Sequence, residues 1–376
     1  MKKKDLQFAI IDNMRLPLVL MVIFIHAFSS VHCVPEDGFD YFLFKYFEST
    51  FSLVVSHIAV PVFFLFSGYL FFNNVERLDI FTYKRKLKSR FSSLFVPYLV
   101  WNLLFALFLF SKLLVKAYIG GDALPSIISF FNEQGGFHIF WDCNIWNLDR
   151  VNWVGYTIPA SAPILIPLWF LRDLIIISLI TPFIFYSIKK LRLLYFMVLL
   201  AGYLLNLWPY IPGIEGDALL FYSIGANVAI ENDTLQDYFS RYRVSSYILF
   251  FVLLIPMVVL KGHTTYLGNI IYPFFITIGV FAALNLFTEL TTRRGGHFSY
   301  CKYSKATFFI YTVHTILILD ISIIVVNRII PLSNGCFSIL KYTLIPLLTL
   351  IISLGMFITL NKVMKPILAV LTGNRN

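Results

Sequence analysis

Long apolar runs alternate with short polar connections along almost the whole chain. Most runs are about 17–25 residues long, which is enough for a helix to cross about 30 Å of hydrocarbon. This pattern predicts an all-α integral membrane protein with about ten transmembrane helices, of which the sixth is short. We place these helices near residues 10–32, 48–72, 92–113, 161–187, 193–211, 217–231, 244–260, 266–289, 306–328 and 339–361.

Composition and charge agree with this assignment and add an orientation. Only 13% of the residues are charged and 59% are hydrophobic, whereas about a quarter of a soluble domain is charged. Basic residues gather in alternate connections, as at 84–90 and 293–294, and acidic residues in the others, as at 36–40. The positive-inside rule therefore predicts that the basic connections and both termini are cytoplasmic. The net charge of +10 is explained by these clusters, and we expect no binding of nucleic acid.

One connection, at about 114–160, is long and is predicted to lie on the outer side. It is rich in tryptophan and glycine. Two interpretations fit it equally well: an ordered cap or lid over an opening, or an interfacial loop anchored to headgroups. Asp12 and Arg15 interrupt the first apolar run, so we interpret that run as a retained helix rather than a cleaved signal. We expect a single membrane domain over residues 1–376, without an appended soluble domain.

The first run carries two polar side chains on one helical face. Arg15 and His26 are eleven positions apart, which on a helix places them within about 20° of each other and about 16 Å apart along the axis. Polar groups inside a membrane are costly and by default functional. The alternative is a snorkelling arginine and a histidine satisfied by a neighbouring helix. Because an unpaired buried arginine is expensive, we expect Arg15 to be paired even without a ligand.

Further polar motifs follow along the chain, each with a structural alternative. The second run ends in Phe-Phe-x-x-Ser67-Gly68-Tyr69, which offers hydroxyl donors or simply close helix packing through small residues. A basic stretch leads to Pro-Tyr-x-x-Trp-Asn at 97–102 and suits anionic phosphates, or only determines topology. The remaining motifs are Trp169-Phe-Leu-Arg172-Asp173, an intramembrane polar network that is catalytic or architectural, and Phe-x-Ile-Tyr311-x-x-His314 near the start of the ninth helix.

In this order, the motifs resemble those of the integral-membrane acyltransferase-3 family, over about residues 8–365. The resemblance implies ten core helices and transfer of an acyl group, usually acetyl, from cytoplasmic acyl-coenzyme A to a carbohydrate hydroxyl. The acceptor would be a surface polysaccharide, peptidoglycan or a lipid-linked sugar. It further implies that His26 is catalytic and Arg15 its motif partner. The family's arginine-x-x-arginine spacing is blurred here into Lys86, Lys88 and Arg90, which leaves the coenzyme A contacts open residue by residue.

The chemistry of acyl transfer assigns roles to these side chains. Histidine, with an ordinary pKa of about 6.5, suits removal of the hydroxyl proton, so we predict His26 as general base in a ternary complex. An acyl-histidine intermediate is the competing mechanism. No metal is expected. The predicted donor-binding residues are Lys86, Lys88, Arg90, Ser67, Tyr311 and His314, and the predicted substrate network consists of Trp169, Arg172, Asp173 and Tyr69.

Two other classes of function fit the same residues. A secondary transporter or flippase for a sugar or glycolipid would use the intramembrane polar groups to bind substrate or relay protons. A non-catalytic membrane partner of a glycan-synthesis machine would tolerate loss of His26. Binding of coenzyme A to the purified protein separates the enzyme from the transporter. We expect the protein in a bacterial inner or plasma membrane; the acceptor sugar, the acyl length and the oligomeric state stay open.

Overall fold

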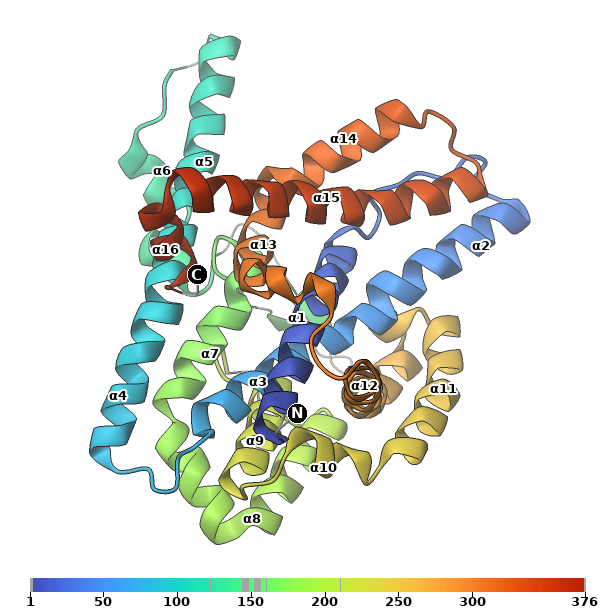
Figure 1. The fold of residues 1–376 in the computed structure, drawn as a ribbon. Helices are drawn as coiled ribbons and strands as arrows, with labels where there is room; N and C mark the ends of the chain where they lie inside the picture. Colours follow the sequence, from blue (N-terminus) through green and yellow to red (C-terminus); the bar gives the residue numbers. More distant parts are fainter. Residues whose placement is uncertain are drawn as a thin grey trace.

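The computed structural model describes residues 3–121, 123–143, 149–151, 157–159, 161–209 and 211–374. Within these ranges the secondary structure is helical apart from one short antiparallel strand pair, β1 (Asp149–Val151) with β2 (Thr157–Pro159) (Figure 1). The predicted all-α class is thus confirmed but for this pair. The α-helices are α1 (Lys3–His26), α2 (Gly38–Ser49), α3 (Ala59–Phe72), α4 (Ile80–Arg90), α5 (Val96–Gly120), α6 (Ile127–Glu133), α7 (Trp169–Leu179), α8 (Thr181–Leu204), α9 (Gly216–Ile230), α10 (Leu235–Ser240), α11 (Arg243–Val259), α12 (Tyr266–Arg294), α13 (Thr307–Val313), α14 (Leu319–Ile329), α15 (Gly335–Val363) and α16 (Lys365–Thr372).

Several helices are joined through short π- or 3₁₀-helical segments instead of loops. A π-segment inserts one extra residue per turn and occurs often at functional sites. The π-segments are η1 (Thr50–Val54), η3 (Phe91–Phe95) and η9 (His314–Ile318). The 3₁₀ segments are η2 (Val55–Ile58), η4 (Gly136–Phe140), η6 (Ile166–Leu168), η7 (Gly262–Thr264) and η8 (Ser299–Ala306).

Fewer helices than predicted are long and apolar enough to span a membrane. Among the described residues there are six, or seven if the pair Ile166–Leu179 and Thr181–Leu204, bent by 62° at its break, forms one span. Two shorter apolar helices, α9 and α11, add to these. The predicted count of about ten is therefore not confirmed. The chain bends before α8 because Pro182 in its first turn has no amide to continue the preceding helix, whereas the predicted division at 187–193 is only a kink, at Leu191.

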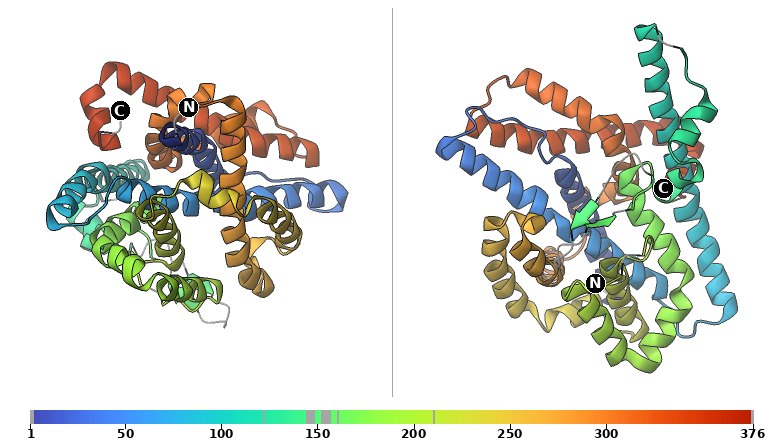
Figure 2. Two further views of the ribbon diagram at one scale, coloured as in Figure 1. Left: turned by 60° about the horizontal axis from the view of Figure 1, so that its bottom comes forward. Right: turned by 180° about the vertical axis from the view of Figure 1, so that it is seen from behind.

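Helix α1 runs through the middle of the molecule, where α3, α12, α13 and α15 pack against it (Figures 1 and 2). It ends at His26, six residues before the predicted end at 32, because the next turn is fixed from outside. Ser29 has a positive φ of 58°, and its amide donates to the buried Glu48 carboxylate at 2.9 Å. The Ser52 hydroxyl donates to the carbonyl of Phe24 at 2.5 Å, which satisfies one of the carbonyls that a helix end leaves free.

Two prolines inside helices free backbone carbonyls, and side chains from elsewhere bind both. Pro17 has no amide for the carbonyl of Asn13, which instead accepts the Tyr300 hydroxyl at 2.8 Å. Pro273 in α12 likewise frees the carbonyl of Asn269, which accepts the Asn206 side-chain amide at 3.3 Å. Because hydrocarbon offers no hydrogen bonds, such partners allow proline within an apolar helix.

Helices α3 and α9 approach each other through paired glycines. A Cβ atom on Gly68 would collide with the carbonyl of Tyr222, and one on Gly225 would collide with the carbonyl of Leu65. Both backbones therefore touch where neither residue has a side chain, as is common between membrane helices. Ser67-Gly68-Tyr69 thus has the packing role that we had set beside the functional one, and Tyr69 is buried beside this crossing.

Candidate active site

His26 and His314 meet at the centre of the candidate site and are called here the first histidine pair. Their ring centroids lie 5.1 Å apart with a 57° angle between the ring planes. His26 is the last residue of α1, and His314 is the first residue of η9, where α13 gives way to a π-segment. Residues far apart in the sequence are therefore brought together by the packing of α1 against α13.

His314 is completely buried and is held by its own helix. Its Nδ1 lies 2.8 Å from the carbonyl oxygen of Tyr311 and 3.2 Å from that of Ile310. Since carbonyl oxygens only accept, Nδ1 donates and carries the proton, so Nε2 has a free lone pair. Within the described part of the chain, Nε2 has no hydrogen-bond partner. The site therefore contains a buried base nitrogen beside the predicted catalytic histidine.

Tyr311 connects the first histidine pair to the long connection between α5 and α7. Its ring lies 6.2 Å from that of His314 and 5.9 Å from that of Phe170. Its hydroxyl donates to the carbonyl of Pro167, which is a backbone atom in η6. The structure thus places Tyr311 and His314, both predicted to bind the donor, beside His26.

The two described ends of the long connection, residues 136–143 and 161–168, form a unit that we call the strap. The amide of Cys143 donates to the carbonyl of Ala162 and that of Ile164 to the carbonyl of Ile139, both at 2.8 Å. Ile139, Ala162 and Ile164 are buried. These residues of the strap therefore pack into the molecule. A loop that lay on lipid headgroups would not bury such side chains. The predicted cap or lid also involves residues 144–148, 152–156 and 160, which lie outside the described residues.

Arg172 fastens the strap to α7. Its guanidinium donates to the Trp141 carbonyl and to the Ser161 hydroxyl, each at 2.7 Å, and bridges to Asp173 at 3.0 Å. It also lies over the Trp141 ring, 5.4 Å from the centroid. Arg172 and Asp173 are 2% and 0% exposed, so this is a buried ion pair. The sequence left a catalytic and an architectural role open for this network. The contacts described here are architectural. Trp169, beside them in α7, is half-buried with its ring 6.2 Å from that of Phe64.

The Pro-Tyr-x-x-Trp-Asn motif also holds the strap. Tyr98 of α5 donates its hydroxyl to the carbonyl of Phe140, and Asn102 accepts the amide of Leu165 at 3.2 Å. Trp101 points elsewhere and donates to the carbonyl of Leu371 in α16 at 2.9 Å. The polar residues of this motif therefore fix neighbouring segments in place.

Arg15 is paired, as predicted for an arginine in such surroundings. Its guanidinium bridges to Asp12 at 2.8 Å on the same helix, and both side chains are about one-third exposed, at 34% and 28%. Arg15 and His26 share α1, but eleven residues separate them by about 16 Å along the axis. The guanidinium therefore serves a different part of the site from the imidazole.

Helix α4 carries the predicted basic donor-binding residues. The residue that caps its start is Asp79, whose carboxylate accepts the amide of Thr82 at 2.7 Å. This bond holds the pKa of Asp79 below its ordinary value. Lys86 and Arg90, one turn apart, both lie over the buried Phe71 ring, at 5.8 and 5.6 Å from its centroid. We call these two cations the basic face of α4.

The basic face does not include all three predicted cations. Arg90 also donates to the backbone carbonyl of Ser67 at 3.2 Å, which joins α4 to the end of α3. Lys88 lies two residues away from both members of the face and is exposed. The structure therefore groups Lys86 and Arg90 with Ser67 and separates Lys88 from them.

Sequence reasoning did not single out three groups that the structure shows to be important. Glu48 is completely buried and pairs with Lys45 at 2.9 Å while holding the turn after His26. The Asn13 side chain donates to Thr291 and accepts the amide of Phe298, at 2.8 and 2.9 Å. An acidic or amide residue inside an apolar run is a signal that it needs such partners.

The third group is a second histidine pair, His57 with His263. Their ring centroids lie 5.3 Å apart, and the Tyr272 ring lies 5.8 Å from His57 and 5.1 Å from His263. His263 is exposed, and His57 and Tyr272 are half-buried. The pair joins η2, η7 and α12, so these ring contacts give it a role in packing between elements.

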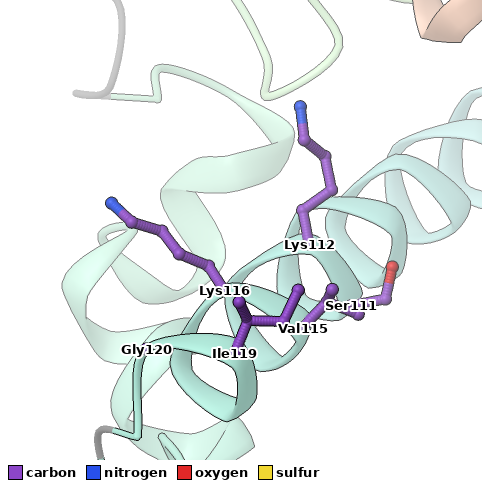
Figure 3. A pocket seen from close by; sticks show the side chains of 6 residues that line it. All are labelled: Ser111, Lys112, Val115, Lys116, Ile119 and Gly120. Carbon is purple, nitrogen blue, oxygen red and sulfur yellow. The ribbon is translucent and has the colours of Figure 1, made fainter.

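A separate hollow of about 630 Å³ follows the last turns of α5 and is lined by Ser111, Lys112, Val115, Lys116, Ile119 and Gly120 (Figure 3). This end of α5 projects beyond the rest of the molecule together with α6 (Figure 1). The lining residues include two ammonium groups but no imidazole or carboxylate. This hollow is therefore a poorer candidate for acid–base chemistry than the first histidine pair.

The fold and this site define a multi-pass helical membrane protein with a histidine-centred polar site in its core. The chain matches the acyltransferase-3 family model, described as an acyltransferase domain, over residues 8–360. It therefore belongs to this family, which confirms the resemblance drawn from the motifs. No curated protein matches the chain significantly. No solved structure does so either.

Proposed function

We propose that the protein is a membrane-embedded O-acyltransferase that moves an acetyl group from acetyl-coenzyme A to a hydroxyl of a carbohydrate or lipid-linked glycan. Membership of the family supports acyl transfer in general. The observation that carries the finer proposal is the position of His26: it ends the central helix, with its ring 5.1 Å from a fully buried second histidine. A side chain that removes a hydroxyl proton needs such a fixed place.

In the proposed reaction, a nitrogen of His26 accepts the proton of the acceptor hydroxyl. The hydroxyl oxygen attacks the thioester carbonyl carbon, a carbon–oxygen bond forms and the carbon–sulfur bond breaks. Coenzyme A leaves as its thiolate, which takes the proton from the His26 imidazolium. All atoms and charges balance without a metal or redox partner, and both substrates are bound together in one complex.

The basic face of α4 is proposed to hold the phosphates of the donor. Lys86 and Arg90 present two cations on one side of the helix, and the charged group of each lies over the Phe71 ring. A guanidinium and an ammonium side by side suit the pyrophosphate and ribose phosphate of coenzyme A. Arg15 is a further cation on α1 for the same donor and would exchange its bond to Asp12 for a phosphate.

We further propose that the termini and basic connections face the cytoplasm of a bacterial inner or plasma membrane. Contacts between connections support this grouping. Gln7 near the start of α1 accepts the amide of Leu235 at 3.0 Å, and Arg192 bridges to Glu231 at 3.1 Å. On the other set of connections, the amide of Val34 donates to the carbonyl of Ser333 at 2.7 Å. Connections that charge assigns to one side thus touch each other.

The test is transfer of radiolabelled acetyl from acetyl-coenzyme A by the purified protein in lipid nanodiscs to a panel of glycan and lipid-linked acceptors. We expect label in at least one acceptor and release of free coenzyme A in equal amount. Binding of coenzyme A without transfer to any sugar would contradict the acceptor class. A stable labelled protein formed without acceptor would replace direct transfer by an acyl-histidine intermediate.

The donor site has its own test with a matched control. Lys86→Ala and Arg90→Ala are expected to raise KM for acetyl-coenzyme A while kcat changes little, because a phosphate contact remote from the thioester binds ground and transition states alike. Lys88→Ala removes the same charge from an exposed position next to them and is expected to leave KM within about twofold. Equal effects of all three substitutions would show that the basic face acts only through net charge.

A further inference from the structure

The first histidine pair has a feature that the proposed reaction does not use. Nδ1 of His314 is occupied by the carbonyl oxygens of Tyr311 and Ile310. Nε2 on the opposite side of the ring carries a lone pair, is buried, and lacks a hydrogen-bond partner among the described residues. A buried acceptor is normally bonded, and an exception calls for an explanation.

The neighbouring His26 ring is a suitable donor to this nitrogen. Two imidazoles joined by an N–H···N bond of about 3 Å have their centroids on the order of 5 Å apart, and the observed separation is 5.1 Å. Neutral histidine has one N–H and one lone pair, so a bond from one nitrogen leaves the other as the base. The partner of one ring nitrogen thus decides which nitrogen can accept a proton from substrate.

The backbone around His314 is built to aim this ring. His314 begins the π-segment η9, and within it Leu317 departs from helical geometry with φ 175° and ψ −24°. π-segments occur often at functional sites, and the carbonyls of Tyr311 and Ile310 in the turn before this one hold the His314 ring. On the other side, Glu48 and Ser52 fix the end of α1 that carries His26. Both rings therefore stand on fixed backbone.

We propose that His314 is a positioning residue: a small rotation of the His26 ring from its present 57° tilt lets it donate an N–H bond to the still unpaired Nε2 of His314, which presents the other nitrogen of His26 to the acceptor hydroxyl. His314 stays neutral, makes no contact with the reacting atoms and transfers no proton. This inference rests on the proposed function and extends it, because the sequence placed His314 with the donor-binding residues instead. The role corresponds to that of the third member of a catalytic triad, with an imidazole in place of a carboxylate.

The kinetic test compares His314→Ala with His314→Gln. Alanine removes the acceptor, whereas a glutamine amide can donate to a carbonyl with its nitrogen and accept with its oxygen. We expect kcat to fall on the order of 10²-fold in His314→Ala, with KM for acetyl-coenzyme A within about twofold of wild type. Part of the lost kcat should return in His314→Gln. His57→Ala, which alters the second histidine pair, is the matched control and should keep kcat near wild type.

Three results would overturn the proposal. Unchanged kcat in His314→Ala would show that the nitrogen is not needed. A loss confined to KM for acetyl-coenzyme A would make His314 a donor contact. A His314→Gln protein that is folded and no more active than His314→Ala would show that accepting a hydrogen bond is not the property that matters.

A spectroscopic measurement decides the same point without activity. In protein labelled with ¹⁵N-histidine, His314 should show a protonated Nδ1 and an unprotonated Nε2, and the Nε2 resonance should move in His26→Phe because its donor is lost. A resonance that does not move, or a proton on Nε2, would overturn the proposal, even if His314→Ala fails to fold. The Nε2 resonance of His314 could depend on His26 in a protein that transfers no acetyl group to any acceptor. That result would count against the proposed function and not against the hydrogen bond between the two rings.

Discussion

The two histidine pairs have almost the same ring separation, 5.1 Å and 5.3 Å, but they lie in different surroundings. In the first pair, His314 is fully buried and one of its nitrogens is fixed by backbone carbonyls. In the second pair, His263 is exposed and His57 half-buried. Water can replace a partner for an exposed ring, whereas a buried ring depends on its protein neighbours. Ring proximity alone therefore does not define a catalytic histidine.

The tyrosine beside each pair shows the same contrast. Tyr311 is buried and donates to the backbone of the strap, so the first pair is connected to Arg172 and to α5 through bonded groups. Tyr272 is half-buried and packs against both rings of the second pair. Catalysis favours groups whose orientation is set before substrate arrives. The first pair is therefore the part of the molecule where small changes should have large effects.

The largest expected difference comes from replacing one histidine in each pair. His26→Ala removes the proposed general base and should lower kcat/KM for acetyl transfer by about 10²–10⁴-fold. His57→Ala should change it by no more than about twofold. Both proteins are compared by acetyl transfer in nanodiscs at equal concentrations of folded protein. Substantial transfer by His26→Ala, or equal losses in the two variants, would remove the distinction between the pairs.

The next effect concerns the strap that leads to the first pair. Arg172→Met leaves the Asp173 carboxylate buried without its partner, which should lower the free energy of unfolding by about 3–5 kcal/mol. Arg241→Met breaks the bridge to Asp233, whose arginine is 64% exposed, and should cost no more than about 1 kcal/mol. Unfolding of purified protein in mixed micelles measures both.

A double variant sharpens this experiment. Arg172→Met combined with Asp173→Leu removes both charges, so it should recover part of the stability lost in Arg172→Met alone. If the double variant recovers none of that stability, the loss in Arg172→Met comes from the hydrogen bonds to Trp141 and Ser161, which both variants lack, and not from the unpaired carboxylate.

Much of the membrane character and part of the site could be predicted from the sequence. Apolar runs and clustered charge are local properties, and they predicted the helical membrane class correctly. The spacing of Arg15 and His26 placed both on one helix, and the cost of a lone buried charge predicted that Arg15 is paired, as it is with Asp12. Ordered motifs predicted the family, which the match over residues 8–360 confirms.

The rest depends on contacts between distant parts of the chain. Periodicity does not say which helices touch, so the meeting of His26 with His314 could not be predicted. The end of α1 is set by Glu48, from another helix, and was placed six residues too late. For the long connection, the sequence left an ordered cap or lid and an interfacial loop equally open, because turn and aromatic residues do not show what they pack against; Arg172 holds the strap against α7. A polar residue in an apolar run indicates that it has a polar partner, but it does not show which residue that partner is.

A smaller effect is expected from the tyrosines. Tyr311→Phe leaves the buried Pro167 carbonyl without its donor, which should lower the free energy of unfolding by about 1–3 kcal/mol and reduce kcat through the displaced strap. Tyr272→Phe keeps the ring in a half-buried place and should cost less than about 1 kcal/mol. The measurements are unfolding in mixed micelles and acetyl transfer. A larger loss in Tyr272→Phe would contradict the contrast between the pairs.

The smallest effect on activity is expected from chemical modification of the second pair. Diethyl pyrocarbonate acylates accessible neutral imidazoles, so exposed His263 should react early and buried His314 late, as followed by mass spectrometry of their peptides. Activity should not fall with modification of His263, because that ring serves contact between elements and not proton transfer. The matched control is His263→Gln, which loses the early-reacting peptide and should be inactivated at the wild-type rate. Two results would contradict this contrast: slower inactivation of His263→Gln than of wild type, or loss of activity at the same rate as modification of His263. Either would show that the second pair takes part in catalysis.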